Sequence, residues 1–72
     1  MTGDHFREVL IALGLTQTQI ARLFEVATTT VWRWAEGTAR IPVAVTLVLL
    51  ILQHTDLTYD DLLEMRMALV SP

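Results

Sequence analysis

The sequence predicts an all-α protein made of five short helices, and three observations support this fold class. Apolar residues recur at helical spacing in five successive segments, and capping residues separate these segments. The chain has 72 residues, enough for one domain over residues 1–72. Its 53% hydrophobic content is too high for a disordered chain, and the absence of cysteine excludes a disulfide framework.

The first two helices are predicted from their caps. The first runs from about Gly3 to Leu13, with Thr2 as its N-cap and Gly14 as a left-handed stop. The second opens at Thr16, which stands three residues before Gln19 in the arrangement of a capping box. Their inner faces are expected to hold Phe6, Val9, Leu10 and Leu13, and then Ile20, Ala21 and Phe24.

The third helix is predicted over 28–36, ending at Gly37, with Val31 and Trp34 on its inner side. Pro42 suits the first position of a fourth helix over about 43–54. The β-branched residues of that segment also fit a strand, but a single strand would have no partner, so a helix is favoured. A fifth helix follows Thr58, which caps toward Asp61, and carries Leu62, Leu63, Met65, Met67 and Leu69.

The charge is distributed unevenly along the chain. The net charge is −3, but residues 1–53 hold four acidic residues and four arginines, giving zero. Residues 54–72 hold four acidic residues and one arginine, giving −3: Asp56, Asp60, Asp61 and Glu64 against Arg66. All the excess acid therefore lies in the last quarter of the chain.

Several classes of protein are disfavoured. The longest apolar run, residues 41–52, is shorter than the roughly 20 residues that a bilayer requires, and no signal peptide is indicated. His5 and His54 have no partners at ligand spacing, and no phosphate loop or nucleophile motif occurs. We expect a cytoplasmic protein that is not an enzyme and has no metal, cofactor, membrane or small-molecule ligand.

Two short helices joined by the tight turn of residues 24–27 form a helix-turn-helix candidate. The longer stretch from residue 13 to residue 42 resembles the Cro/C1-type (XRE-like) helix-turn-helix repressor family of phages and bacteria. The residues that carry this resemblance are Leu13-Gly14-Leu15-Thr16-Gln17, Ile20-Ala21, Phe24, Val26, Val31, Trp34 and Gly37.

The resemblance covers residues 4–54 best, and the fifth helix loosely. It implies a five-helix lambda-repressor-like domain that binds operators as a dimer. Two positions depart from the family pattern. Glu25 stands where the family usually has glycine in the turn, and Ala27 is a poor N-cap for the third helix, although Thr28 could cap it after a one-residue shift.

The third helix is expected to enter the major groove with its N-terminal residues against the bases. Thr28, Thr29 and Arg33 are the predicted base-reading residues, with Trp32 beside them. Arg33 could bind O6 and N7 of one guanine, which is worth roughly 1–3 kcal/mol of discrimination. It could instead be a solvated charge or pair with Glu36, and Trp32 fits a sugar–phosphate edge or a dimer contact equally well.

Other residues are expected to hold the DNA backbone. The resemblance assigns a phosphate contact to Gln17 at the N-terminus of the second helix, where amides favour an anion. Thr16 is included, although a capping role alone explains it. Gly37, Thr38 and Arg40 follow the third helix and could grip the opposite backbone. Because arginines are few, we expect weak non-specific binding to DNA. We also expect the fifth helix, which is acidic, to face away from DNA.

The fourth helix is apolar nearly all round, which predicts a dimer interface. If one side faces the core, Val43, Leu47, Leu50 and Ile51 form a second side, partly covered by the fifth helix. Residues 43–70 would thus serve both core and dimerisation. The predicted interface residues are Leu47, Leu50, Ile51 and Met67, with Met65 or Leu69 as alternatives to Met67.

The predicted function is that of a sequence-specific transcriptional regulator of double-stranded DNA. We expect an autoregulatory repressor that binds an inverted repeat as a homodimer, with its recognition helices about 34 Å apart. Its small size suits a phage regulator of the anti-CRISPR-associated kind or an antitoxin autorepressor in a bacterial cell. The alternative is a protein-interaction module, an antitoxin or adaptor that keeps the fold without binding an operator, which the low basic charge favours.

Overall fold

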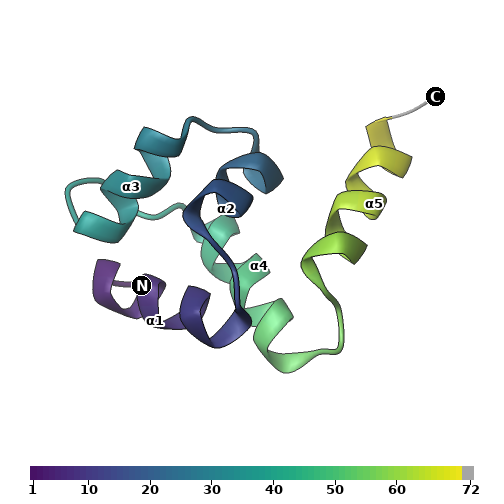
Figure 1. Cartoon of the computed structure of the whole chain (residues 1–72), viewed down its shortest axis with the longest axis horizontal. Coiled ribbons are helices and arrows are strands. Elements are labelled where there is room, and N and C mark those ends of the chain that lie inside the picture. Colours follow the sequence, from purple (N-terminus) through teal and green to yellow (C-terminus); the bar gives the residue numbers. More distant parts are fainter. Residues whose placement is uncertain (71–72) are drawn as a thin grey trace.

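The chain folds into helices joined by short connections, as a computed structural model of residues 1–70 describes it. Within these residues there are five helices and no strand: α1 (Gly3–Leu13), α2 (Gln17–Phe24), α3 (Thr28–Glu36), α4 (Val43–His54) and α5 (Tyr59–Val70) (Figure 1). The prediction of an all-α protein is confirmed. The strand alternative for residues 43–54 is wrong, because this segment is α4.

Side-chain caps fix the starts of the helices where the sequence indicates them. The Thr2 hydroxyl accepts a hydrogen bond from the His5 amide at 3.1 Å at the start of α1. At the start of α2, the Thr16 hydroxyl accepts from the Gln19 amide at 3.1 Å, and the Gln19 side chain accepts from the Thr16 amide at 2.8 Å. Gly14 ends α1 with φ 70°, a backbone conformation that glycine adopts without strain.

One hydrophobic core joins the first four helices. Phe6, Ile20, Val31 and Leu49 are the largest fully buried side chains, and each comes from a different helix. Phe6 meets Trp34 edge to face, with ring centroids 6.2 Å apart. Burying one such side chain contributes about 1.5–3 kcal/mol, so the packing of these four helices together holds α3 in place.

α1 and α3 approach each other closely at one end of the core. A β-carbon at Gly3 would lie 2.5 Å from the carbonyl oxygen of Ala35, which is too close for two non-bonded atoms. Only glycine, which has no β-carbon, fits at this position without a clash. Arg7 also links the two helices, because its guanidinium lies 3.4 Å from Glu36 and 2.7 Å from Asp4. These contacts fix the C-terminal end of α3 against the first helix.

Two local details differ from the expectations. Pro42 is the N-cap of α4, with φ −58° and ψ 144°, and the helix begins one residue later, at Val43. Its extended ψ places Pro42 just outside the helix, although its carbonyl still accepts from the amides of Val45 and Thr46. Leu23, which is not among the predicted inner residues of the second helix, is also buried.

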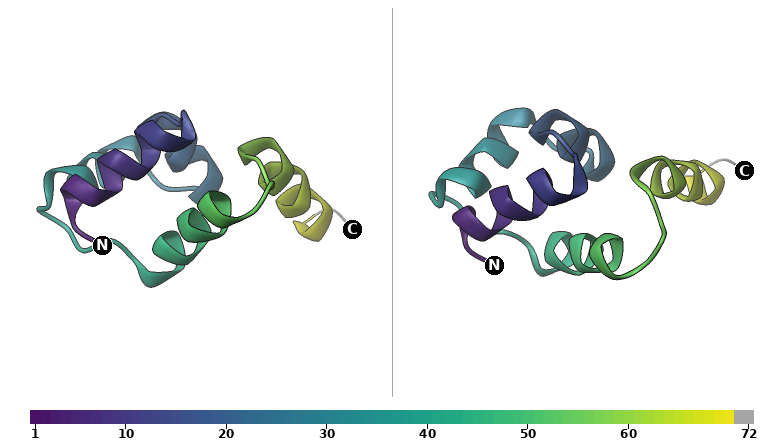
Figure 2. Two further views of the ribbon diagram at one scale, coloured as in Figure 1. Left: turned by 90° about the horizontal axis from the view of Figure 1, so that it is seen from below. Right: turned by 60° about the horizontal axis from the view of Figure 1, so that its bottom comes forward.

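α5 packs beside α2 and lies at the opposite end of the molecule from α3 (Figures 1 and 2). Its start is capped as predicted, since Thr58 and Asp61 accept from each other's amides at 3.2 and 2.9 Å. Arg66 donates from Nη1 to the carbonyl oxygens of Arg22 and Leu23, at 2.7 and 2.6 Å. A cation therefore caps the C-terminal end of α2, where it also offsets the helix dipole.

The attachment of α5 is less extensive than that of the other helices. Between Tyr59 and Leu69 no side chain is fully buried. The apolar side of α5 borders an open groove beside α2 and α4, lined by Leu23, Phe24, Val48, Leu62, Met65, Arg66 and Leu69. None of the described helices has the length and apolar character needed to cross a membrane.

Candidate nucleic-acid interface

The turn between α2 and α3 has a left-handed residue at its first position. Glu25, the C-cap of α2, has φ 55° and ψ 45°, where the resembled family usually has glycine. This backbone conformation costs a residue with a β-carbon on the order of 1 kcal/mol. The turn is closed by a hydrogen bond from the Val26 amide to the Ala21 carbonyl at 3.0 Å. Glu25 thus adopts the conformation that reverses the chain between the two helices.

α3 begins without a side-chain cap. Ala27 is its N-cap and provides no hydrogen bond, and the helix starts at Thr28. The one-residue shift that would make Thr28 the cap is not adopted. Thr28 and Thr29 are both exposed, so the positive end of the α3 dipole and its first amides face the surface.

The predicted base-reading residues share one exposed face of α3. Thr28, Thr29, Trp32 and Arg33 are all exposed, while the opposite face of the helix is buried through Val31, Trp34 and Ala35. Trp32 keeps 54% of its surface exposed although it is a large aromatic side chain. No part of the chain within residues 1–70 covers these four residues, which remain available to a partner.

Arg33 forms no ion pair with Glu36, the acidic residue nearest to it along α3. Glu36, one helical turn further along α3, contacts Arg7 of α1 at 3.4 Å. Within residues 1–70, Arg33 has no carboxylate within 4 Å. The alternative of an Arg33–Glu36 pair is thus not formed. Arg7 and Glu36 are 29 positions apart, so no local sequence pattern could have indicated their contact.

The predicted phosphate-contacting residues come from both ends of the α2–α3 unit. Gln17 is the first residue of α2 and is half-buried. Thr16 uses its hydroxyl to cap α2, which confirms its capping role. Gly37, Thr38 and Arg40 are exposed in the loop after α3. In this loop the Thr38 hydroxyl donates to the carbonyl of Arg33 at 3.4 Å, which ties the loop to the end of the helix.

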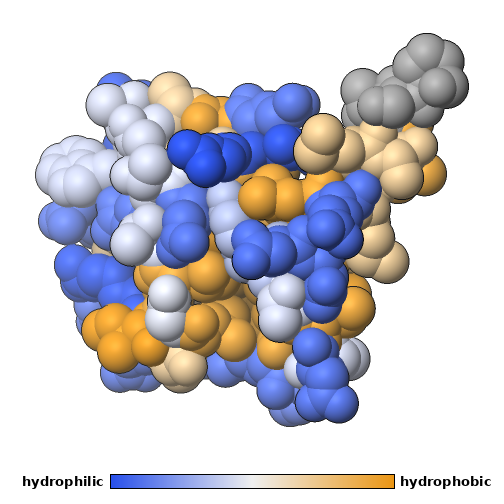
Figure 3. All heavy atoms as spheres, turned by 45° about the vertical axis from the view of Figure 1, so that its right-hand side comes forward, coloured by the Kyte–Doolittle hydropathy of each residue, from blue (hydrophilic) through white to orange (hydrophobic). Residues whose placement is uncertain are grey.

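The predicted dimerisation residues are all exposed, but they come from two helices. Leu47, Leu50 and Ile51 lie on α4, and Met67 lies on α5. Figure 3 views the face that includes α5, where hydrophobic atoms gather along the C-terminal half of this helix. Because α5 packs beside α2, the exposed side of α4 remains open.

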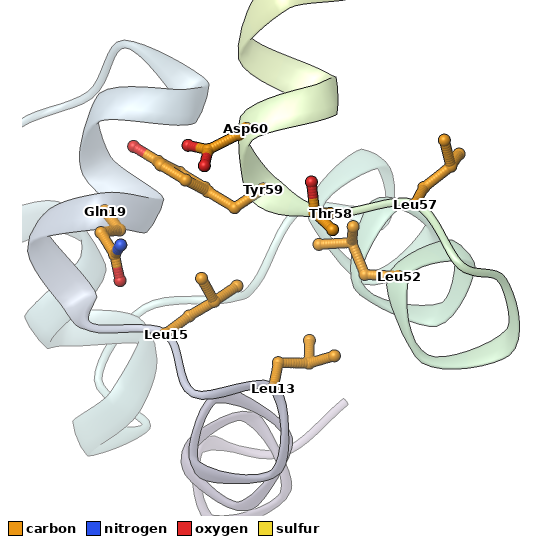
Figure 4. A pocket seen from close by; sticks show the side chains of 8 residues that line it. All are labelled: Leu13, Leu15, Gln19, Leu52, Leu57, Thr58, Tyr59 and Asp60. Carbon is orange, nitrogen blue, oxygen red and sulfur yellow. The ribbon is translucent and has the colours of Figure 1, made fainter.

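A pocket of about 300 Å³ lies where α5 begins (Figure 4). Its apolar lining is Leu13, Leu15, Leu52 and Leu57, and its polar lining is Gln19, Thr58, Tyr59 and Asp60. Gln19 and Thr58 use their oxygen atoms as helix caps. Tyr59 extends from α5 toward α2, and its buried hydroxyl has no hydrogen-bond partner among the described residues. The pocket therefore lies between helix ends, and two of its polar side chains, Gln19 and Thr58, already serve as helix caps.

The titratable side chains do not form a metal cluster. In the described part of the chain, no three of its histidine and acidic residues lie close enough together to hold a metal ion. The acidic residues at 56, 60, 61 and 64 lie at the α5 end of the molecule, away from the exposed face of α3. Compared with known protein families, curated proteins and solved structures, the chain has no significant match.

Proposed function

We propose that this chain is a helix-turn-helix DNA-binding domain of the Cro/C1 type that acts as a transcriptional regulator. The observation that carries the proposal is the exposed face of α3, with Thr28, Thr29, Trp32 and an Arg33 that pairs with no carboxylate of the described residues. A helix whose outer face has no partner in the described part of the chain suits a major groove, which admits one α-helix. The turn at Glu25 and the capped start of α2 support the same assignment.

Each group has a distinct role in this proposal. Arg33 reads a guanine through its planar fork, and the two threonines contact thymine methyl groups and base edges. Gln17, with the N-terminus of α2, holds one phosphate, and Arg40 with its loop holds the other side of the groove. The protein binds as a homodimer to an inverted repeat, and the two copies of α3 enter successive major grooves.

The charge distribution is compatible with this role despite the net charge of −3. Residues 1–53 are neutral overall, and the excess of acidic over basic residues lies at the α5 end, far from α3. Non-specific attraction to DNA depends on the number of protein cations that neutralise phosphates. Each neutralised phosphate adds about −0.9 to the slope of log affinity against log salt concentration. Affinity should therefore come mainly from base contacts and dimerisation, with a shallow salt dependence.

The test begins with selection of bound sequences from a random pool of duplex DNA. Titration of the selected site in gel shifts then compares the wild type with Arg33→Ala, Arg33→Lys and Arg22→Ala. Arg22 is an exposed arginine of α2 outside the proposed interface, so its loss matches the charge change without touching base recognition. We expect Arg33→Ala to lose roughly 1–3 kcal/mol of discrimination at one guanine, and Arg33→Lys to restore it only partly.

The second candidate is a protein-interaction module with the same fold, such as an antitoxin or adaptor. The low number of cations favours it. It predicts that the wild type selects no sequence from the pool and that Arg33→Ala changes nothing on DNA. A reporter driven by the protein's own promoter then separates autoregulation from control of other genes: repression that disappears with Arg33→Ala supports an autorepressor.

A further inference from the structure

The side of α4 that faces away from the core carries a continuous apolar stripe. Val43, Leu47, Leu50 and Ile51 are 64, 54, 37 and 46% exposed, respectively. Their spacing of four, three and one residues places them on one side of the helix, opposite the buried side chains of Val45, Leu49 and Leu52. We call the four exposed residues the outer stripe of α4.

The outer stripe is unusual in its lack of charge. α4 contains no acidic residue, lysine or arginine from Val43 to His54. Exposed helix faces ordinarily alternate polar and charged side chains, which keep them hydrated. A contiguous apolar patch on a small protein marks a contact surface, and α5 does not cover it because α5 packs beside α2.

We propose that the outer stripe of α4 packs against the outer stripe of a second copy across a two-fold axis, and that α5 lies outside this interface. The proposal deepens the proposed function and rests on it for the identity of the partner. Val43, Leu47 and Leu50 follow the four-and-three spacing of a coiled-coil seam, and helices packed through such a seam lie about 8–10 Å apart.

Charge distinguishes α4 from α5 as the site of self-association. In a two-fold dimer the same patch meets itself, so any net charge on the patch meets an equal charge. The outer stripe carries none. α5 carries Asp60, Asp61 and Glu64 against Arg66, a net charge of −2 on each copy. Two such helices brought together would repel each other, so the exposed methionines of α5 are the less favourable contact.

The requirement for a second copy also follows from the small number of cations. Arg33 and Arg40 are the arginines at the proposed DNA surface, since Arg7 is paired, Arg66 caps α2 and Arg22 lies on α2 outside the proposed interface. A single copy therefore neutralises few phosphates. In a dimer, once one copy has bound its half-site, the second copy binds its own half-site as an intramolecular step. This raises the affinity for DNA without adding a contact between either copy and the DNA.

The first experiment uses the absence of cysteine from the chain. Single cysteines are introduced on α4 as Leu47→Cys or Leu50→Cys. The control cysteines are Met67→Cys on α5 and Ile11→Cys on α1, at positions where the wild-type side chains are 63 and 80% exposed. Mild oxidation should yield a covalent dimer from one or both α4 variants, because a disulfide forms only where α-carbons come within about 7 Å. A Met67→Cys dimer formed as efficiently, or no dimer from either α4 variant, overturns the proposal.

The second experiment measures association directly. Leu47→Glu places a charge in the seam and should raise the dimer dissociation constant in sedimentation equilibrium by about tenfold or more, which corresponds to ~1.4 kcal/mol. Met67→Glu, at a position that is somewhat more exposed than Leu47, should leave the dimer dissociation constant unchanged. Circular dichroism checks that both variants stay helical. A wild-type monomer, or a larger effect of Met67→Glu, refutes the interface, whereas a wild-type dimer that selects no DNA refutes only the proposed function.

Discussion

The left-handed backbone at Glu25 makes a specific prediction about stability. With φ 55° and ψ 45°, this residue holds a β-carbon in a conformation that glycine adopts freely. We expect Glu25→Gly to raise the free energy of unfolding. The turn itself should keep its shape, because the substitution removes atoms and leaves the hydrogen bond from Val26 to Ala21 intact.

The magnitude follows from three contributions. Relief of the left-handed conformation stabilises by about 1–2 kcal/mol. The greater freedom of glycine in the unfolded chain costs about 0.4–1 kcal/mol. Removing a negative charge from the C-terminal end of α2, where the helix dipole disfavours it, contributes about 0.3 kcal/mol. The net gain is about 1 kcal/mol, which raises the melting temperature of a domain of this size by about 4–8 °C.

Thermal unfolding followed by circular dichroism, at one protein concentration throughout, measures this shift. Glu25→Gln is the matched control, because it removes the charge and keeps the β-carbon, and it should give only a small part of the gain. Gly14→Ala tests the same physics in reverse. A β-carbon there meets nothing within 4 Å, so its cost is the left-handed backbone at φ 70°. Equal gains from Glu25→Gly and Glu25→Gln, or a loss from Glu25→Gly, would refute the reasoning.

Three further predictions test the core, the attachment of α5 and the freedom of Arg33. Leu49→Ala should lower the free energy of unfolding in urea by about 2–5 kcal/mol, because Leu49 is fully buried; a loss typical of a surface site would contradict its place in the core. Arg66→Gln should cost about 1 kcal/mol and speed amide exchange in α5 more than in α3, since it removes the cation at the end of α2. Arg7→Ala should weaken binding to the selected DNA site a few-fold, because freed Glu36 can then turn toward Arg33; an exposed pair is worth about 0.2–1 kcal/mol. Adding Glu36→Gln should restore that binding, and a double variant as weak as Arg7→Ala would rule out this cause.

The helix boundaries were predictable because their determinants are local. Thr2, the Thr16–Gln19 box and Gly14 act through hydrogen bonds or backbone angles within a few residues, so the sequence pattern contains the whole interaction. The exposed face of α3 was predictable for a similar reason, since its buried partners recur at helical spacing. Pro42 shows the limit of this approach, because its fixed φ suits both the N-cap and the first helical position.

Contacts between distant segments could not be predicted in this way. Arg66 reaches the carbonyl of Arg22 across 44 positions, and whether α5 lies beside α2 or over α4 depends on the packing of the whole chain. The pairing of Arg7 with Glu36 is of the same kind. Leu23 was missed because its burial depends on its neighbours in space, not only on its place in the α2 sequence.

The concentration of acid at one end of an elongated molecule has a kinetic consequence. The chain extends 37 Å along its longest axis, with α5 at one end and α3 at the other. Such a molecule is an electric dipole, and the field of any polyanion exerts a torque that turns the acidic end outward before contact. Diffusional encounters with duplex DNA would then occur mostly with the α3 end toward the DNA, which would raise the association rate. This gain in rate would fade as added ions shorten the Debye length, which is about 10 Å at 0.1 M.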